Sequence, residues 1–180
     1  MRRTTILITL ILLACGQRST EQSMATLAKP AQGAMTITSP AFTDGGAIPQ
    51  KYGCGGESIS PPLAIGGVPK GAKTLALIVT DPDAPGGTFT HWLVWNIPPA
   101  NTSIAEGQAP GGTEGKSDYG KRGYGPPCPP SGSHHYLFDV YALDVSLTLD
   151  ANAERAAVEK AISGHILAQG RIVGTYGKGP

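Results

Sequence analysis

Two short segments of this chain bring carboxylates and imidazoles next to rigid turns. Asp81 and Asp83 belong to an Asp-Pro-Asp-Ala-Pro segment that follows a strongly apolar run, and His91 comes shortly after it. Farther along, a proline-rich turn leads directly into His134. Binding residues are often carried by loops that a rigid scaffold holds in place. We therefore predict that these two aspartates and two histidines converge on one site.

Aspartates paired with histidines have a chemistry suited to anions. A carboxylate that accepts a hydrogen bond from one ring nitrogen fixes the tautomer and favours the charged ring, so the other nitrogen can donate to an anion. Asp81 and Asp83 are expected to support the imidazoles and not to contact the anion, because like charges repel. The pattern indicates a site for a phosphoryl or carboxylate group.

Three long runs predict the strands that position these residues. Residues 74–80 are continuously apolar and β-branched, which is typical of a central strand covered on both faces. Alternation along residues 134–143 places His134 and Tyr136 on the same face. Alternation along residues 89–97 predicts one face with Phe89, His91, Leu93, Trp95 and Ile97 and the other with Thr90, Trp92, Val94 and Asn96. Shorter strands are predicted at 35–37, 64–65 and 171–176.

One helix is predicted near the C-terminus. It begins after Asp150, a competent N-cap residue, and continues toward Gln169, where Gly170 suits a C-cap. His165 lies on its apolar stripe, and Gly164 predicts a break or close packing inside it. By contrast, residues 98–130 are rich in glycine and proline and almost without periodicity, which indicates a functional loop.

The composition favours one β-rich domain. The chain has 180 residues, of which 40% are hydrophobic and 15% charged, enough for one hydrophobic core. Its 25 glycines and 16 prolines argue against a helix bundle. The net charge is only +1, and no block of Lys and Arg is present in the sequence, so we expect no nucleic-acid partner.

The N-terminal residues indicate export. Arg2 and Arg3 precede an apolar run that ends at Cys15, a pattern that resembles a secretory signal with a lipobox. The run is shorter than the roughly 20 residues that a membrane-spanning helix needs. We therefore expect residues 1–14 to be a signal peptide and Cys15 to carry a lipid.

The expected lipid at Cys15 defines the organisation of the mature chain. We expect residues 15–34 to form a lipid-anchored flexible tether and residues 35–180 to form the folded domain. Gly16 resembles the residue found in lipoproteins of the bacterial outer membrane, so the domain is expected to face the periplasm, with the lipid as its one membrane contact. Plain signal cleavage would instead give a soluble periplasmic protein.

Cys54 and Cys128 are the two remaining cysteines of the expected mature chain. An exported protein meets an oxidising compartment, in which a disulfide between them is plausible. Two buried free thiols are the other possibility, and the sequence leaves both open.

The two site segments resemble the paired signatures of the phosphatidylethanolamine-binding protein family, in its bacterial Raf-kinase-inhibitor-like branch. The first signature is Asp-Pro-Asp-Ala-Pro followed by His-Trp, and the second is Gly-Pro-Pro-Cys-Pro-Pro-Ser-Gly-Ser-His-His-Tyr. The likeness spans about residues 37–176. It implies a mostly β fold in which a large, antiparallel-rich central sheet packs on a smaller sheet, with peripheral helices that include a C-terminal one.

The resemblance also implies a small anion pocket at the strand ends. Transferred position by position, its residues are Asp81, Asp83, His91 and His134, with walls from Pro85, Gly125, Pro126 and Tyr136. Prolines would stiffen the rim, and Gly125 would let backbone amides approach the ligand. The sequence departs at His135, where the family usually has arginine. This departure bears on a neighbouring ion pair more than on the pocket, because alternation points His135 away from Tyr136.

The function expected from this resemblance is non-enzymatic binding of a small phosphorylated or carboxylate ligand. We expect no metal or other cofactor, and we expect that the domain also has a protein partner. One alternative is a metal-dependent hydrolase in which the Asp/His cluster holds a divalent ion that activates water, although no short ligand spacing such as His-x-x-x-His supports it. The other is an interaction or inhibitor module that uses the long Gly/Pro loop. The family includes kinase inhibitors, but an exported protein would not meet a cytosolic kinase.

Overall fold

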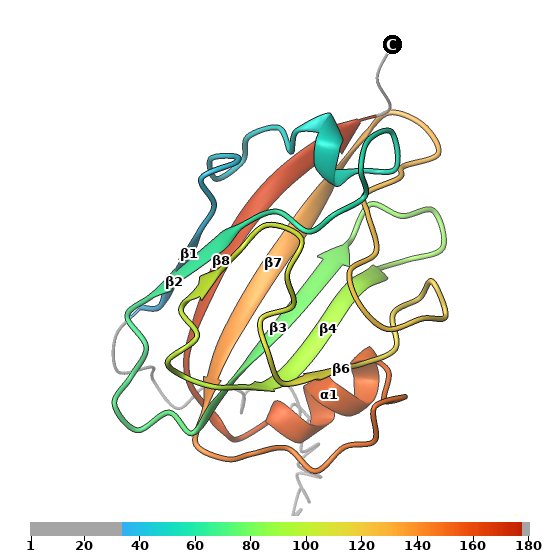
Figure 1. Cartoon of the computed structure of the whole chain (residues 1–180). Helices are drawn as coiled ribbons and strands as arrows, with labels where there is room; N and C mark the ends of the chain where they lie inside the picture. The colour runs from blue at the N-terminus through green and yellow to red at the C-terminus, as the bar shows by residue number, and fades with distance from the viewer. Residues whose placement is uncertain (1–33, 178–180) are drawn as a thin grey trace, which may run out of the picture.

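Two antiparallel β-sheets make up most of the protein, as the computed structural model of residues 34–177 shows (Figure 1). The expected signal peptide, Cys15 and nearly all of the expected tether lie outside these described residues. The strands are β1 (Thr36–Thr38), β2 (Leu63–Gly66), β3 (Thr74–Asp81), β4 (Phe89–Ile97), β5 (Ser103–Ile104), β6 (Thr113–Glu114), β7 (Ser133–Leu143) and β8 (Ile166–Gly177). The helices are the 3-10 helix η1 (Gln50–Tyr52) and α1 (Arg155–Ile162). The mostly β fold class is confirmed.

The larger sheet has the strand order β6-β4-β3-β7-β8, and the smaller sheet has the order β1-β2-β5. Strand β3 lies in the middle of the larger sheet, and all eight of its residues are buried. One hydrophobic cluster fills the space between the two sheets, and a second lies between the outer face of the larger sheet and α1. The prediction of a central strand covered on both faces is therefore confirmed, and its apolar content follows from this double burial.

An irregularity near the end of β4 changes the predicted alternation. Leu75 pairs with Ile97, whereas Leu77 pairs with Val94, so two residues of β4 lie opposite a single residue of β3. Asn96 in this bulge has a positive φ of 57°. A bulge shifts the following side chain to the other face of the sheet. Ile97 therefore packs in the core between the sheets, and the face predicted for it is wrong.

The C-terminal helix begins later than predicted. Its N-cap is Glu154, and α1 starts at the next residue. Asp150 instead accepts a hydrogen bond of 2.8 Å from the backbone N–H of Asn152. This side-chain bond closes a local turn, which is the alternative to capping that aspartate often adopts.

The helix also ends earlier than predicted. Gly164 has φ of 82°, and β8 begins at Ile166, so the predicted helical segment up to Gln169 is wrong. Gly170, predicted as a C-cap, pairs with Val140 inside the sheet, where a Cβ would press against the Met35 backbone. Because β8 pairs with β7 along nearly its whole length, sheet hydrogen bonds outweigh the local helical pattern.

Within residues 34–177, no helix combines the length and the hydropathy of a membrane span. The three shorter strands predicted from sequence correspond to β1, β2 and part of β8. The long aperiodic segment before β7 contributes the short strands β5 and β6 and then passes beside the start of β4 (Figure 1). It therefore reaches the end of the larger sheet at which β3 finishes and β7 begins.

Candidate ligand-binding site

A pocket of about 350 Å³ lies at one end of the larger sheet. Because β3 is antiparallel to both β4 and β7, its last residues lie beside the first residues of those two strands. The lining residues are Asp81, Ala84, Pro85, Phe89, His91, Tyr119, Cys128, Pro129, Pro130, His134 and Tyr136. The volume is at the lower end of the range for small-molecule sites.

Most of the residues predicted for the site line this one pocket. Those that do are Asp81, Pro85, His91, His134 and Tyr136. Those that do not are Asp83, Gly125 and Pro126. The expected meeting of the imidazoles of His91 and His134 around a single cavity is therefore observed, and the three remaining positions need correction.

Asp81 holds the ring of His134 in place. The Nδ1 atom of His134 lies 2.7 Å from Oδ2 of Asp81, and both residues are buried. The other oxygen of Asp81 accepts a hydrogen bond of 2.8 Å from the backbone N–H of Asp83. A carboxylate accepts hydrogen bonds, so Nδ1 of His134 carries the proton and Nε2 is the nitrogen left for a ligand. This arrangement is the one predicted for an aspartate-supported histidine.

His91 reaches the pocket because it is the extra residue of a second bulge in β4. Val79 pairs with Trp92 and the adjacent Thr80 pairs with Thr90, so His91 has no partner on β3. Bulges change the direction of a side chain at the edge of a site. Simple alternation along β4 therefore does not describe the orientation of His91.

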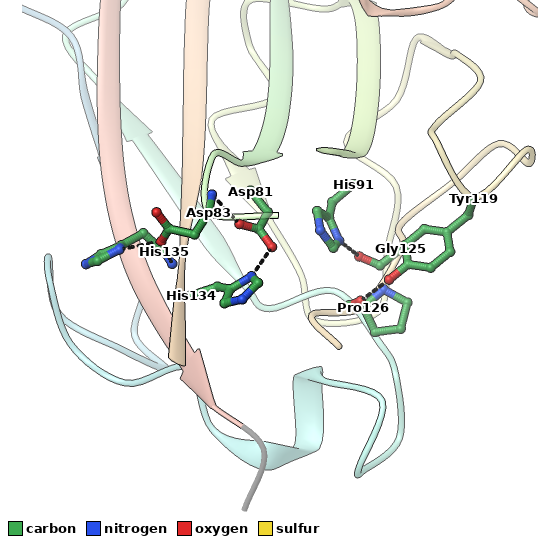
Figure 2. Close-up of polar contacts among 8 residues, drawn as sticks. All are labelled: Asp81, Asp83, His91, Tyr119, Gly125, Pro126, His134 and His135. Carbon is green, nitrogen blue, oxygen red and sulfur yellow. Dashed lines mark hydrogen bonds and ion pairs between the residues drawn. The ribbon is translucent and has the colours of Figure 1, made fainter. Parts of the chain in front are cut away.

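Gly125 sets the tautomer of His91. Its carbonyl lies 2.9 Å from Nδ1 of His91, and its N–H donates a 2.9 Å hydrogen bond to the His91 carbonyl (Figure 2). Since a carbonyl only accepts, Nδ1 must be the protonated nitrogen. The amide of Gly125 itself is occupied by His91 and is not free for a ligand.

Burial keeps the ring of His91 neutral. Loss of solvent is the largest influence and lowers the pKa of His91 below its usual value. The Gly125 carbonyl and the nearby Asp81 and Asp118 carboxylates act in the opposite direction, whereas His134 adds to the lowering. At neutral pH the free Nε2 of His91 is therefore a hydrogen-bond acceptor, contrary to the expectation that both histidines present a donor.

Asp83 lies outside the pocket and pairs with His135. Its Oδ2 accepts hydrogen bonds from the backbone N–H of His135 at 2.8 Å and from Nδ1 of His135 at 2.7 Å. These bonds lower the pKa of Asp83, the backbone bond most strongly. Alternation along β7 turns His135 to the face opposite His134, and Asp83 follows it. The prediction of Asp83 as a pocket residue is wrong for this reason.

The aspartates and histidines thus form separate contacts and do not gather in one cluster. Figure 2 shows the Asp83–His135 pair on one side of the Asp81–His134 pair and His91 on the other. Among the residues that the structure describes, no group of three or more His, Cys, Asp or Glu side chains could hold a metal ion.

Three aromatic rings form a wall around His91, and of these only Tyr136 was predicted as a site residue. Phe89 lies 5.1 Å and Tyr119 lies 5.6 Å from the His91 ring, measured between centroids, and Tyr136 lies 5.1 Å from it. The hydroxyl of Tyr119 donates a 2.8 Å hydrogen bond to the carbonyl of Pro126. Pro126, predicted as a wall residue, therefore positions Tyr119 from behind. Tyr119 belongs to the aperiodic loop, where no spacing pattern marks it.

Tyr136 lines the pocket and has a buried hydroxyl. The residue is 1% exposed, and its hydroxyl has no hydrogen-bond partner within residues 34–177. Burial, and to a smaller extent the Asp81 carboxylate, raises the pKa of Tyr136, so the hydroxyl keeps its proton. A buried hydroxyl without a partner is costly.

A disulfide between Cys54 and Cys128 secures the proline-rich wall. The backbone N–H of Cys54 also donates a 2.9 Å hydrogen bond to the carbonyl of Pro127. Cys128 and the two prolines after it line the pocket. Of the two possibilities that the sequence left open, the structure contains the disulfide, which connects this wall to the segment that follows η1.

Sequence comparisons identify relatives over most of the chain. The family model described as phosphatidylethanolamine-binding protein matches residues 38–177. A UPF0098 protein of Methanothermobacter thermautotrophicus is 47% identical over 151 residues, which cover 81% of this chain and 100% of the relative. A Mycobacterium tuberculosis protein named as the lipoprotein LppC is 44% identical over 155 residues, which cover 84% of this chain and 77% of the relative.

Solved structures show the same fold. A crystal structure of a phosphatidylethanolamine-binding protein homologue from Chlamydia trachomatis matches with a TM-score of 0.79 and 44% identity, covering 81% of this chain and 99% of that one. The Escherichia coli protein YbcL, described as a member of the mammalian family, matches with a TM-score of 0.76 and 32% identity. That match covers 82% of this chain and 100% of YbcL.

Proposed function

This chain belongs to the phosphatidylethanolamine-binding protein family, and from this membership we propose that it is a non-enzymatic binding protein for a small anion. The ligand class is a phosphoryl or carboxylate headgroup. The observation that carries the proposal is that the side chains of His91, His134 and Tyr136 line one pocket of about 350 Å³.

The walls of the pocket support binding of a small ligand. Phe89, Tyr119 and the prolines offer apolar contact to the non-ionic part of a ligand. The lining contains no Ser, Thr or Lys, and its single cysteine, Cys128, is in the disulfide. These lining residues therefore offer no Ser or Thr hydroxyl, free thiol or amine as a nucleophile, which supports a binding role. Asp81 is occupied by His134 and by the backbone of Asp83, which supports a positioning role for this carboxylate.

Calorimetric titration of the mature protein with inorganic phosphate and with phosphoethanolamine tests the proposal. Replacing His134 by alanine removes a hydrogen bond to a charged group and leaves Asp81 without its partner, so we expect affinity to fall about tenfold or more. His165→Ala is the matched control, because His165 also pairs with a carboxylate, Asp144, but beyond the opposite end of β7. Failure of the unmodified protein to bind either ligand would refute the proposal.

The proposal places the domain at the bacterial cell envelope through a lipid on Cys15. The lipobox-like residues that end at Cys15 support this placement, as does the relative that is named a lipoprotein. Gly16 favours the outer membrane. Mass spectrometry of the native N-terminus is the test: we expect a diacylated Cys15 as the first residue. An unmodified N-terminus after signal cleavage would instead indicate a soluble periplasmic protein.

A further inference from the structure

The polar atoms of the pocket are unequally divided between acceptors and donors. Nδ1 of His91 donates to the Gly125 carbonyl, which leaves Nε2 with a lone pair in the neutral ring. The hydroxyl of Tyr119 donates its hydrogen bond to the Pro126 carbonyl, so it can only accept a hydrogen bond from a ligand. Asp81 adds a carboxylate, and Nε2 of His134 has a lone pair whenever that ring is neutral. An anion that enters this set of groups meets more lone pairs than protons.

The hydroxyl of Tyr136 does not correct this imbalance. It is buried, whereas a phosphoryl or carboxylate group has at least two oxygens, each with lone pairs to satisfy. A fully ionised anion beside the lone pair of His91 Nε2 would repel it. A proton placed between that nitrogen and a ligand oxygen turns this repulsion into a charge-assisted hydrogen bond.

We propose, on the basis of the anion-binding function proposed above, that the pocket binds its anion together with one proton, which comes to lie on Nε2 of His91. The anion then meets a donor from Nε2 of His91. The same contact can form when the ligand brings the proton itself, as a singly protonated phosphoryl group does. The preferred ligand class is therefore a small oxyanion that arrives with, or recruits, one proton.

The charges around His91 allow this change of state. Asp81 at the end of β3 and Asp118 in the loop before β7 favour a charged ring, as does the Gly125 carbonyl. His134 on β7 opposes it, and burial opposes it most strongly. The hydroxyls of Tyr119 and Tyr136 keep their protons, because burial raises the pKa of both. Bound anionic charge would add to the effect of the two carboxylates and offset the cost of burying the imidazolium.

Coupling to a proton makes the affinity depend on pH with a defined sign. If the ring is neutral in the free protein and charged in the complex, the complex holds one more proton. The affinity for an anion that does not itself titrate then rises by up to about tenfold for each unit that the pH falls. Sulfate is a suitable probe, because its charge stays constant between pH 5.5 and about pH 8.

Calorimetric titration of the mature protein with sulfate at pH 7.5 measures the proton directly. The same titration in two buffers of different ionisation enthalpy gives the number of protons taken up, for which we expect about one per bound sulfate. His91→Gln should abolish this uptake, whereas His165→Gln should retain it. The affinity of the unmodified protein should increase up to about tenfold between pH 7.5 and pH 6.5.

Nitrogen NMR of the four histidines keeps the test decisive if His91→Gln is unstable. In the free protein we expect Nδ1 of His91 to carry the proton and Nε2 to lack one. Addition of sulfate should protonate Nε2 of His91, while His135 and His165 remain unchanged because they lie outside the pocket.

The other possible results of these experiments distinguish failure of the proton coupling from failure of the anion-binding function. Sulfate binding without proton uptake and with constant affinity would overturn the inference and leave the anion-binding function in place. Uptake that appears at His134 would overturn the assignment to His91. Absence of binding to both sulfate and phosphate from pH 5.5 to 8, or tighter binding of tetramethylammonium than of either anion, would overturn the proposed function itself.

Discussion

Removal of the Cys54–Cys128 disulfide should lower the stability of the domain by several kilocalories per mole. The two residues are 74 positions apart in the sequence, and both are exposed. Serine can therefore replace each one without creating a buried cavity. A cross-link over a loop of this length removes unfolded-state entropy worth about 4 kcal/mol at 25 °C in the chain-entropy treatment. We expect the Cys54→Ser/Cys128→Ser variant to lose about that amount.

Thermal and urea unfolding measure this loss. Residues 34–177 form a domain whose unfolding entropy near 60 °C is about 300 cal/mol/K, from a typical 2.1 cal/mol/K for each residue. A loss of about 4 kcal/mol then corresponds to a fall in Tm of about 13 °C. The urea midpoint should fall with little change in the native fold, because the strands of both sheets pair without help from the bridge.

The reduced form of the unmodified protein is the matched control for this experiment. It should unfold at the same temperature as the double serine variant, and the variant itself should not respond to reductant. A loss below about 1 kcal/mol in both forms would refute the reasoning, since the long loop would then contribute almost nothing to the entropy of the unfolded chain. Two reactive thiols per chain in the denatured, unreduced mature protein would show that the bridge is absent.

Three further substitutions test other parts of the structure. In Gly125→Ala, the new Cβ would overlap the Tyr119 ring and displace it from the pocket wall. Calorimetry should therefore show phosphate binding weakened about tenfold, and the free energy of unfolding should fall by about 1–3 kcal/mol. Unchanged affinity would contradict this packing. Asn96 exchanges hydrogen bonds of 2.8 and 2.9 Å with the backbone of Leu147 and has a positive φ. Asn96→Ala should therefore cost about 2–4 kcal/mol in urea unfolding, with about 1 kcal/mol recovered by Asn96→Gly. Because the pKa of His91 is lower in the folded than in the unfolded protein, its neutral ring contributes stability above about pH 6.5 that is lost as the pH falls toward the folded value. His91→Gln should flatten the urea midpoint between pH 7.5 and 5.5 in anion-free buffer, and an equally steep pH profile in this variant would exclude His91 as the cause.

Much of the site follows from local sequence. The alternation that places His134 and Tyr136 on one face is a property of consecutive residues in a strand, and the structure retains it. The apolar run of β3 likewise identifies the central strand from its own residues. The position of Asp81 directly after that run places it at a strand end. These features are predictable because they depend on neighbours a few positions away.

The chemical state of the two imidazoles depends on contacts that are distant in sequence. The carbonyl that sets the tautomer of His91 lies 34 residues away, and the carboxylate that holds His134 lies 53 residues away. The bulge that directs His91 into the pocket becomes visible only when β4 is paired with β3. Asp83 also depends on a contact that is distant in sequence. The geometry of β7 places His135 within hydrogen-bond distance of Asp83, which therefore lies outside the pocket.

From its sequence alone, this protein is determined to be a β-rich domain with paired Asp/His motifs at strand ends, because side-chain alternation and turn residues act over short stretches. Only the tertiary structure decides which of these groups share a pocket and which of their atoms are left to donate or accept. Hydrogen-bond partners, burial and ring charge belong to the assembled environment, and in that environment the free nitrogen of the neutral His91 ring is an acceptor and not the expected donor.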